Sequence, residues 1–150
     1  MKHAPHHISL LCAAAMTAAA FASCELETSD NGKFDGNWHL ERVDTIATGG
    51  STDLSGELRF WAVQKSLVQL SDKAHSDTKY DLRFDRTTDS LRLYNPYVDY
   101  RPDGDPAVTD ATVLAPFGLN STDEHFAVEQ LTGSRLTLAN RKLRLWLRKL

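Results

Sequence analysis

The chain has 150 residues, of which 41% are hydrophobic and 25% are charged, and this size and composition are typical of one folded domain. Its formal net charge is −3, and no basic stripe alternates with aromatic residues along the sequence. A nucleic acid is therefore not predicted as a partner. The sequence also has no phosphate-binding loop, nucleotide fingerprint or poised pair of carboxylates, so neither an enzyme nor a cofactor is predicted.

The N-terminus has the composition of a secretory signal. Met1-Lys2-His3 is a short basic start, and an uncharged run rich in Ala and Leu follows from Ile8 to Phe21. As a helix this run spans roughly 21 Å, which is shorter than the ~30 Å hydrocarbon core of a bilayer. The sequence therefore predicts a signal peptide over residues 1–23 rather than a transmembrane helix.

Phe21-Ala22-Ser23-Cys24 resembles a bacterial lipobox, with Phe21 at the position where Leu is usual. The resemblance implies that Cys24 becomes the first mature residue and carries the lipid. Cys24 would then anchor the protein in the bacterial cell envelope, on the periplasmic or surface face of the outer membrane. Two or three acyl chains hold a protein firmly, since each buried CH2 contributes about 0.8 kcal/mol. The alternative is ordinary cleavage near Ala22 or Ser23, which leaves Cys24 as a free thiol.

Residues 24–33 are predicted to form a lipidated tether. The stretch from Glu25 to Lys33 is polar, with three acidic residues, and it has too little apolar surface to order itself. A short acidic segment after the lipidated cysteine also resembles the surface-export signals of lipoproteins in Bacteroides-type bacteria. It is equally consistent with a simple spacer.

Residues 34–150 are predicted to form one domain, whose first strand lies in the stretch from Phe34 to Val43. Gly36 allows the backbone to turn where a side chain would not fit. From Trp38 onward the apolar residues occupy alternate positions, which is the period of a β-strand. Trp38 is large enough to plug the base of a barrel.

Four further strands are predicted between residues 57 and 94. After a polar loop over residues 45–55, Leu58, Phe60 and Ala62 are predicted to share one face of a strand over residues 57–63. The other three predicted strands span residues 66–70, 79–85 and 90–94, and the last two form a hairpin.

A loop is predicted next, over residues 95–106, which are rich in Pro, Gly, Asp and Tyr. A short helical turn is predicted over residues 109–114, capped by Thr109 or Asp110 and stopped before Pro116. Three strands follow, over residues 125–131, 135–139 and 142–149. Eight strands with short turns predict an all-β, up-and-down antiparallel barrel, because closing the sheet removes its exposed edges.

Gly36-Asn37-Trp38 is similar to the Gly-x-Trp signature of the lipocalins. With the lipobox and the C-terminal pairs Leu136/Leu138 and Leu143/Leu145, it makes residues 34–150 resemble the small lipocalin-like lipoproteins of Bacteroides-type bacteria.

The resemblance implies an eight-stranded cup with a structural base that includes Gly36 and Trp38. In the lipocalins a basic residue near the last strand packs over this Trp. Arg148 or Arg144 is expected in that role here.

The interior of the barrel decides whether a ligand fits inside it. An eight-stranded barrel is just wide enough to be filled by its own side chains or to hold one small ligand. The residues predicted to point inward are mostly large, which favours a filled base and leaves an open upper cavity as the alternative. They are Trp38, Leu40, Leu58, Phe60, Val68, Leu70, Tyr80, Leu82, Phe84, Leu91, Leu93, Phe126, Val128, Leu136, Leu138, Leu143, Leu145 and Leu147.

Aromatic residues are the predicted ligand contacts. Tyr94, Tyr97 and Tyr100 recur every three residues and, with Phe60 and Phe117, are predicted to line the open end of the barrel. Tyr combines an apolar body with a polar hydroxyl, which suits an amphipathic ligand or a partner surface. The alternative is that these rings only cover the end of the barrel.

No metal site is predicted. The spacing of Asp99, Asp103 and Asp105 does not match an EF-hand loop. His39 and His125 are predicted to be surface residues. His75-Ser76-Asp77 contains the residue types of a catalytic triad, but three consecutive residues cannot face one another as such a relay requires.

Two functions follow from the sequence. The first is non-catalytic binding of a small hydrophobic or amphipathic ligand at the open end of a membrane-anchored barrel. The second is an interaction protein whose filled barrel acts as an inhibitor or accessory subunit of an envelope complex. Both rest on the resemblance in fold, and a fold by itself does not determine function.

Overall fold

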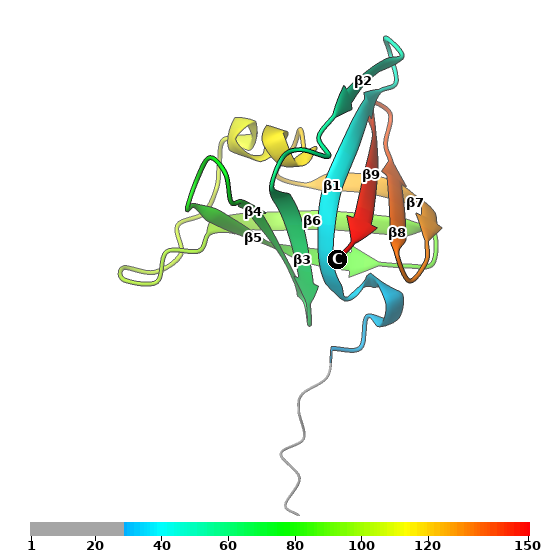
Figure 1. Cartoon of the computed structure of the whole chain (residues 1–150). Coiled ribbons are helices and arrows are strands. Elements are labelled where there is room, and N and C mark those ends of the chain that lie inside the picture. The colour runs from blue at the N-terminus through cyan, green and yellow to red at the C-terminus, as the bar shows by residue number, and fades with distance from the viewer. Residues whose placement is uncertain (1–28) are drawn as a thin grey trace, which may run out of the picture.

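A computed structural model describes residues 29–150 of the chain. The predicted signal peptide over residues 1–23 and the predicted lipidation at Cys24 lie outside the described residues. Nine strands and two short 3-10 helices make up the described part (Figure 1). The strands are β1 (Gly36–Thr45), β2 (Gly50–Asp53), β3 (Arg59–Gln64), β4 (Leu67–Asp72), β5 (Lys79–Arg86), β6 (Ser90–Val98), β7 (Glu124–Leu131), β8 (Arg135–Ala139) and β9 (Leu143–Lys149); the helices are η1 (Gly32–Phe34) and η2 (Ala111–Phe117).

The strands form one antiparallel sheet that closes on itself. Each strand from β3 to β8 pairs with the next one along the chain, and β1 pairs with both β3 and β9. Eight strands therefore make a closed up-and-down barrel, with η2 before the last three strands, and the predicted fold class is confirmed. The four-residue strand β2 is additional and pairs only with the second half of β1. Its residues are all exposed, so the sequence has no apolar alternation there and predicts only a loop.

The two ends of the barrel are covered by different helices (Figure 1). We call the end near η1 and the chain terminus the base, and the end near η2 the rim. At the base, Phe34 of η1 is buried and its ring packs edge-on against Phe84, with the centroids 5.2 Å apart. At the rim, the turn before β9 lies beside the end of β1, where the Ile46 N–H donates to the Lys142 carbonyl.

The interior is filled by large apolar side chains. Most residues predicted to point inward belong to the buried core or pack against it, including Trp38, which is fully buried. The core also contains Leu114, Phe117 and Leu119 from η2 and the residues that follow it. The connection across the rim therefore contributes apolar side chains to the core.

The register of β3 differs from the prediction by one residue. Trp61 and Val63 belong to the core, whereas Leu58 is 46% exposed. Phe60 lies on the outer face, beneath the Lys73 ammonium 4.9 Å from its ring centroid. The consecutive aromatic residues Phe60 and Trp61 make both registers plausible from sequence, and a shift by one residue exchanges the two faces of a strand.

The predicted helical turn is η2, which begins and ends later than expected. The Asp110 side chain accepts a hydrogen bond from the Thr112 N–H, as predicted for a cap. Pro116 lies inside the helix, and Gly118 ends it in the left-handed conformation at φ +86°. Neither η1 nor η2, the helices within residues 29–150, is long or apolar enough to cross a bilayer.

Candidate ligand-binding groove

A bulge in β6 brings Tyr94 and Tyr97 to the same outer face of the barrel. Residues three positions apart on a regular strand point to opposite faces. Here Tyr94 pairs with Arg83 and Tyr97 pairs with Asp81, so one extra residue of β6 is accommodated between the two pairs. Asn95 supplies it in the left-handed region at φ +50°, which Asn tolerates better than most residues, and Pro96 follows without an N–H to donate.

The groove forms where β6 and β7 separate. Their pairing ends at Leu93 and Glu124, so the second half of β6 continues without β7 beside it. The segment around Ala107 covers part of this edge instead, because Val98 donates to the Pro106 carbonyl. A groove of about 590 Å³ remains on the outer wall. We call it the tyrosine groove; it is lined by Arg83, Arg92, Tyr94, Asn95, Pro96, Tyr97, Asp105, Ala107, Val108, Thr122 and Asp123.

Charged side chains of both signs lie along the tyrosine groove. Arg92 forms a bidentate ion pair with Asp123, in which Nε donates to Oδ1 at 2.9 Å and Nη2 donates to Oδ2 at 2.7 Å. The same guanidinium lies 4.6 Å from the centroid of the Tyr94 ring. Arg83 donates to the Ser66 hydroxyl at 3.0 Å. The groove thus offers aromatic rings beside fixed hydrogen-bonding groups.

Near Tyr97, two carboxylates accept hydrogen bonds from one amide. Gln69 Nε2 donates to Asp81 at 3.0 Å and to Asp99 at 3.3 Å, and Asp81 is buried although it faces outward. Burial raises the pKa of Asp81; the Gln69 hydrogen bond opposes this rise, and the charges of Asp99 and Asp105 add to it. Burial, with the nearby Asp81 charge, also raises the pKa of Tyr97.

The structure places the other three predicted contact residues elsewhere. Phe117 is buried in the core at the rim, where its ring lies 6.1 Å from that of Tyr80. Phe60 is on the outer face of β3, and Tyr100 is 51% exposed beside a separate hollow. Only Tyr94 and Tyr97 of the five therefore share a groove. In the sequence, the spacing of the tyrosines indicated this site. Arg83 and Arg92 could not be recognised as site residues, because charged residues alternate with apolar ones on several strands.

A second groove, of about 620 Å³, lies across Asp123 from the first. Its floor includes Phe126 and the small residues Ala127 and Ala139, and Arg141 and Lys142 line one side. Its rings are the buried Phe126 and the imidazole of His125, and it has no tyrosine. The tyrosine groove is therefore the better candidate for an amphipathic ligand.

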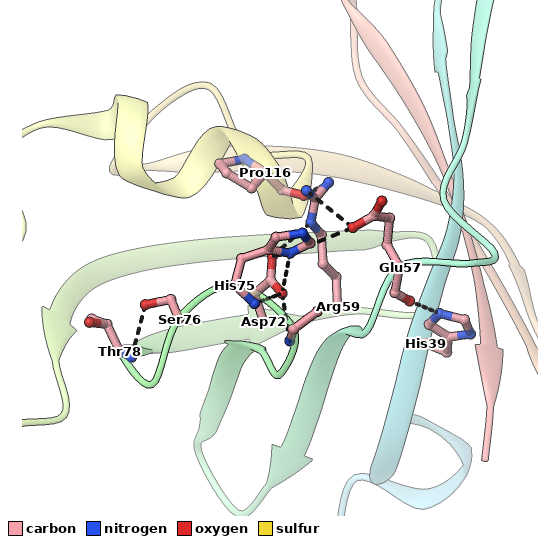
Figure 2. A network of polar contacts seen from close by, with 9 residues as sticks. His39, Glu57, Arg59, Asp72, His75, Ser76, Thr78 and Pro116 are labelled. Carbon is pink, nitrogen blue, oxygen red and sulfur yellow. Dashed lines mark hydrogen bonds and ion pairs between the residues drawn. The ribbon is translucent and has the colours of Figure 1, made fainter.

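A polar network closes the rim beside η2 (Figure 2). Arg59, on the inward face of β3, donates to Asp72 at 3.1 Å and to the Pro116 carbonyl at 3.4 Å. Asp72 also accepts from the backbone N–H and ring of His75. Burial opposes ionisation of Asp72, but the hydrogen bonds from His75 and Arg59 outweigh it and lower the pKa of that carboxyl. The network fixes one edge of η2 over the barrel.

His39 is buried, which corrects the prediction of a surface position. Its Nε2 lies 2.6 Å from the Glu57 carbonyl oxygen (Figure 2). Its ring centroid lies 5.2 Å from that of Phe60. The outer face of β1 is covered here by the segment before β3, which the sequence pattern does not reveal. His125, in contrast, is exposed as predicted.

The base of the barrel is closed by Lys149, in the role that was expected of Arg148 or Arg144. The Lys149 ammonium lies 4.7 Å from the Trp38 ring centroid and donates to the carbonyls of Lys33 and Asp35 at 2.6 Å. Gly36 has φ +117°, and a Cβ there would lie 3.5 Å from the Lys149 side chain.

Arg148 and Arg144 point to the outer face. Arg148 contacts Glu41, and Arg144 forms a bidentate ion pair with Glu129. The alternation of β9 is the reason: Leu145 and Leu147 point inward, so Arg144 and Arg148, which flank them, face outward.

Within residues 29–150, no group of three or more His, Cys, Asp or Glu side chains is arranged to hold a metal ion. Near Tyr97, the carboxylates of Asp81 and Asp99 share Gln69 as a hydrogen-bond donor.

The closed barrel of eight antiparallel strands, with a 3-10 helix at the base and a Trp beneath a basic residue, defines a lipocalin-type fold. The chain belongs to the family described as lipocalin-like domain, whose model matches residues 19–150.

Two solved structures share the fold. A lipocalin-like protein from Bacteroides uniformis ATCC 8492 superposes with a TM-score of 0.61 at 21% identity, covering 79% of this chain and all of its own. An uncharacterized protein from Bacteroides eggerthii DSM 20697 has a TM-score of 0.53 at 15% identity, covering 77% of this chain and 98% of its own. No curated protein matches the sequence.

Proposed function

We propose that this protein is a lipid-anchored component of the cell envelope that binds a small amphipathic ligand in the tyrosine groove without catalysis. The lipocalin-like barrel supports a small-ligand binding protein. The observation that carries the proposal is the groove itself, which holds two of the predicted contact residues, Tyr94 and Tyr97. The outer wall replaces the open end as the proposed site, because Leu114, Phe117 and Leu119 fill the rim.

The dimensions and chemistry of the groove suit such a ligand. Small-molecule sites typically have volumes of about 300–1,000 Å³, apolar or aromatic walls and a few fixed polar groups. Tyr94, Pro96 and Val108 provide the apolar wall, and Arg92 and Asp123 provide paired charges at one side. The rings would pack against the apolar part of the ligand while its polar part meets Arg83, Arg92 or the Tyr97 hydroxyl.

The binding test is native mass spectrometry of the full-length protein in lipid nanodiscs, with and without organic extraction. We expect a small co-purified mass that extraction removes and that returns when a fatty acid or sterol from a panel is added. Tyr97→Ala should weaken rebinding at least about tenfold, the equivalent of 1.4 kcal/mol. Tyr100→Ala is the matched control, because Tyr100 lies outside the groove. Equal rebinding by the two variants would contradict the proposed site.

The anchor has a separate test. Cys24→Ala should move the protein out of the membrane fraction, because an unlipidated chain lacks the acyl groups that hold it there. Retention in the membrane fraction would show that another feature holds the protein.

The filled interior favours a second candidate, an interaction protein that acts as an inhibitor or accessory subunit of an envelope complex. With Trp38, Trp61 and Phe117 buried, the barrel could serve as a solid support for its outer surface. A clean apo mass with no response to the ligand panel, together with a specific cross-linked envelope protein, would favour this function over the first.

A further inference from the structure

The first described residues are already fixed to the base of the barrel. The Lys65 N–H donates to the Ser29 hydroxyl at 2.6 Å, and Asn31 Nδ2 donates to the Lys65 carbonyl at 2.7 Å. Ser29 also donates to Asp35 at 2.6 Å. The end of the predicted tether is therefore part of the folded body, and only the residues before Ser29 can act as a spacer.

This attachment limits how far the base can lie from a lipid on Cys24. A chain extends at most ~3.6 Å per residue, so the segment from Cys24 to Ser29 reaches at most roughly 18 Å. The rim is farther away, because β1 alone is roughly 30 Å long at about 3.3 Å per residue and a barrel strand tilt of about 40° leaves a height of roughly 23 Å. Figure 1 shows η1 and η2 at opposite ends of the barrel.

We infer that the barrel base is the surface that faces the lipid leaflet, and that the rim and the tyrosine groove face the aqueous side. The inference rests on the lipid anchor of the proposed function. Lys33 and Arg86 are exposed at the base, but Asp30 and Asp89 are exposed there as well. The short tether, rather than a net charge, sets the orientation.

This orientation determines how a ligand reaches its site. Tyr97 pairs with Asp81 toward the rim end of β5, and Val108 and Thr122 of the groove lie on the connection that crosses the rim. The ligand therefore enters from the aqueous phase rather than by lateral diffusion from the bilayer. It has to be soluble as a monomer or be delivered by another protein.

Two single-cysteine variants of the full-length lipidated protein test the inference. Thr88→Cys lies in the exposed turn at the base and Arg141→Cys in an exposed turn at the rim. Each is labelled with a thiol-reactive fluorophore in vesicles of phosphatidylethanolamine and phosphatidylglycerol that contain a headgroup nitroxide. We expect several-fold stronger quenching at position 88 than at position 141.

Quenching that is equal at the two positions, or stronger at position 141, would overturn the inference. Flotation of the same samples separates this result from a failure of the anchor. If the protein does not float with the vesicles, the proposed lipid anchor at Cys24 is wrong, and so is the orientation that depends on it. If the protein floats but both labels are quenched equally, the anchor is supported and only the proposed orientation is wrong. Rebinding of the ligand to the groove is measured independently of both.

Discussion

Lys149 lies over Trp38, with its ammonium 4.7 Å from the centroid of the ring and bonded to the carbonyls of Lys33 and Asp35. One side chain thus joins the end of the last strand to η1 and to the start of the first strand. Beneath it, Trp38 Nε1 donates to the Phe34 carbonyl at 2.8 Å. The base is closed by contacts among residues from both ends of the barrel sequence.

Lys149→Met should destabilise the protein more than Arg148→Met. The first variant keeps the apolar stem but loses two charged hydrogen bonds and a cation–π contact, together worth roughly 1–3 kcal/mol. Arg148 contacts Glu41 on a half-exposed face, and such pairs contribute about 0–1 kcal/mol. Urea unfolding of both variants measures the difference. Equal losses of unfolding free energy in the two variants would mean that the contact between Lys149 and Trp38 does not stabilise the protein.

The contrast between these two residues shows what could be predicted from the sequence. Alternation and turn residues are local patterns, and they were sufficient to predict eight strands. Closure of the barrel was predicted from the exposed edges that an open sheet would have. Alternation with the inward residues Leu145 and Leu147 places Lys149, rather than Arg148, on the inward face, so this local signal was present in the sequence and the prediction of Arg148 did not follow it. For β3 the local pattern is not sufficient, because Phe60 and Trp61 are adjacent and only the pairing with β1 selects the inward ring.

The candidate site was predicted in part for a similar reason. The spacing of Tyr94 and Tyr97 indicated the correct segment of the chain. The bulge at Asn95 and Pro96, however, is what places both rings on the same face of the sheet. A regular strand would have placed one of the two rings in the barrel. Arg92 became part of the site only through its pairing with Asp123 across the gap between β6 and β7.

Gly118→Ala should lower the free energy of unfolding by roughly 2–4 kcal/mol, because it combines an unfavourable positive φ with overpacking. Gly118 ends η2 at φ +86°, and an added Cβ would lie 2.6 Å from Leu145 Cδ2. Gly133→Ala is the matched control, since nothing lies within 4 Å of a Cβ at that turn position. Thermal and urea unfolding would measure both variants. A neutral Gly118→Ala variant would contradict the close packing of η2 on the core.

Asp81→Asn should raise the melting temperature at pH 7. The pKa of Asp81 is raised in the folded state, so its ionised form opposes folding at pH values above that pKa. The amide keeps an acceptor for Gln69 and carries no charge. The gain should shrink as the pH falls toward the ordinary Asp pKa of about 4, where the parent carboxyl is also protonated.

Asp72→Asn should instead lower the melting temperature at pH 7. The pKa of Asp72 is lowered, so its ionised form stabilises the fold above the ordinary Asp pKa, and this contribution is lost as the pH falls through the folded-state value. The variant should therefore melt below the parent at pH 7, and the difference should disappear in acid. Melting curves of the parent and both variants between pH 3 and 7 would reveal the two trends, and parallel curves for both variants would contradict them.

Trp61→Phe should cost less stability than Trp38→Phe. Both indoles are fully buried and paired across β1 and β3, so each substitution removes the same volume from neighbouring parts of the core. Trp38→Phe also leaves the Phe34 carbonyl without its donor. Trp61 Nε1 has no hydrogen-bond partner among the described residues, so its replacement removes an unsatisfied donor. An unpaired buried polar group costs about 1–3 kcal/mol, and we expect a difference of about 1–2 kcal/mol between the variants in urea unfolding. If Trp61→Phe is the more costly change, its indole N–H is satisfied in solution, and a water molecule or a bound ligand inside the barrel would be the partner to look for.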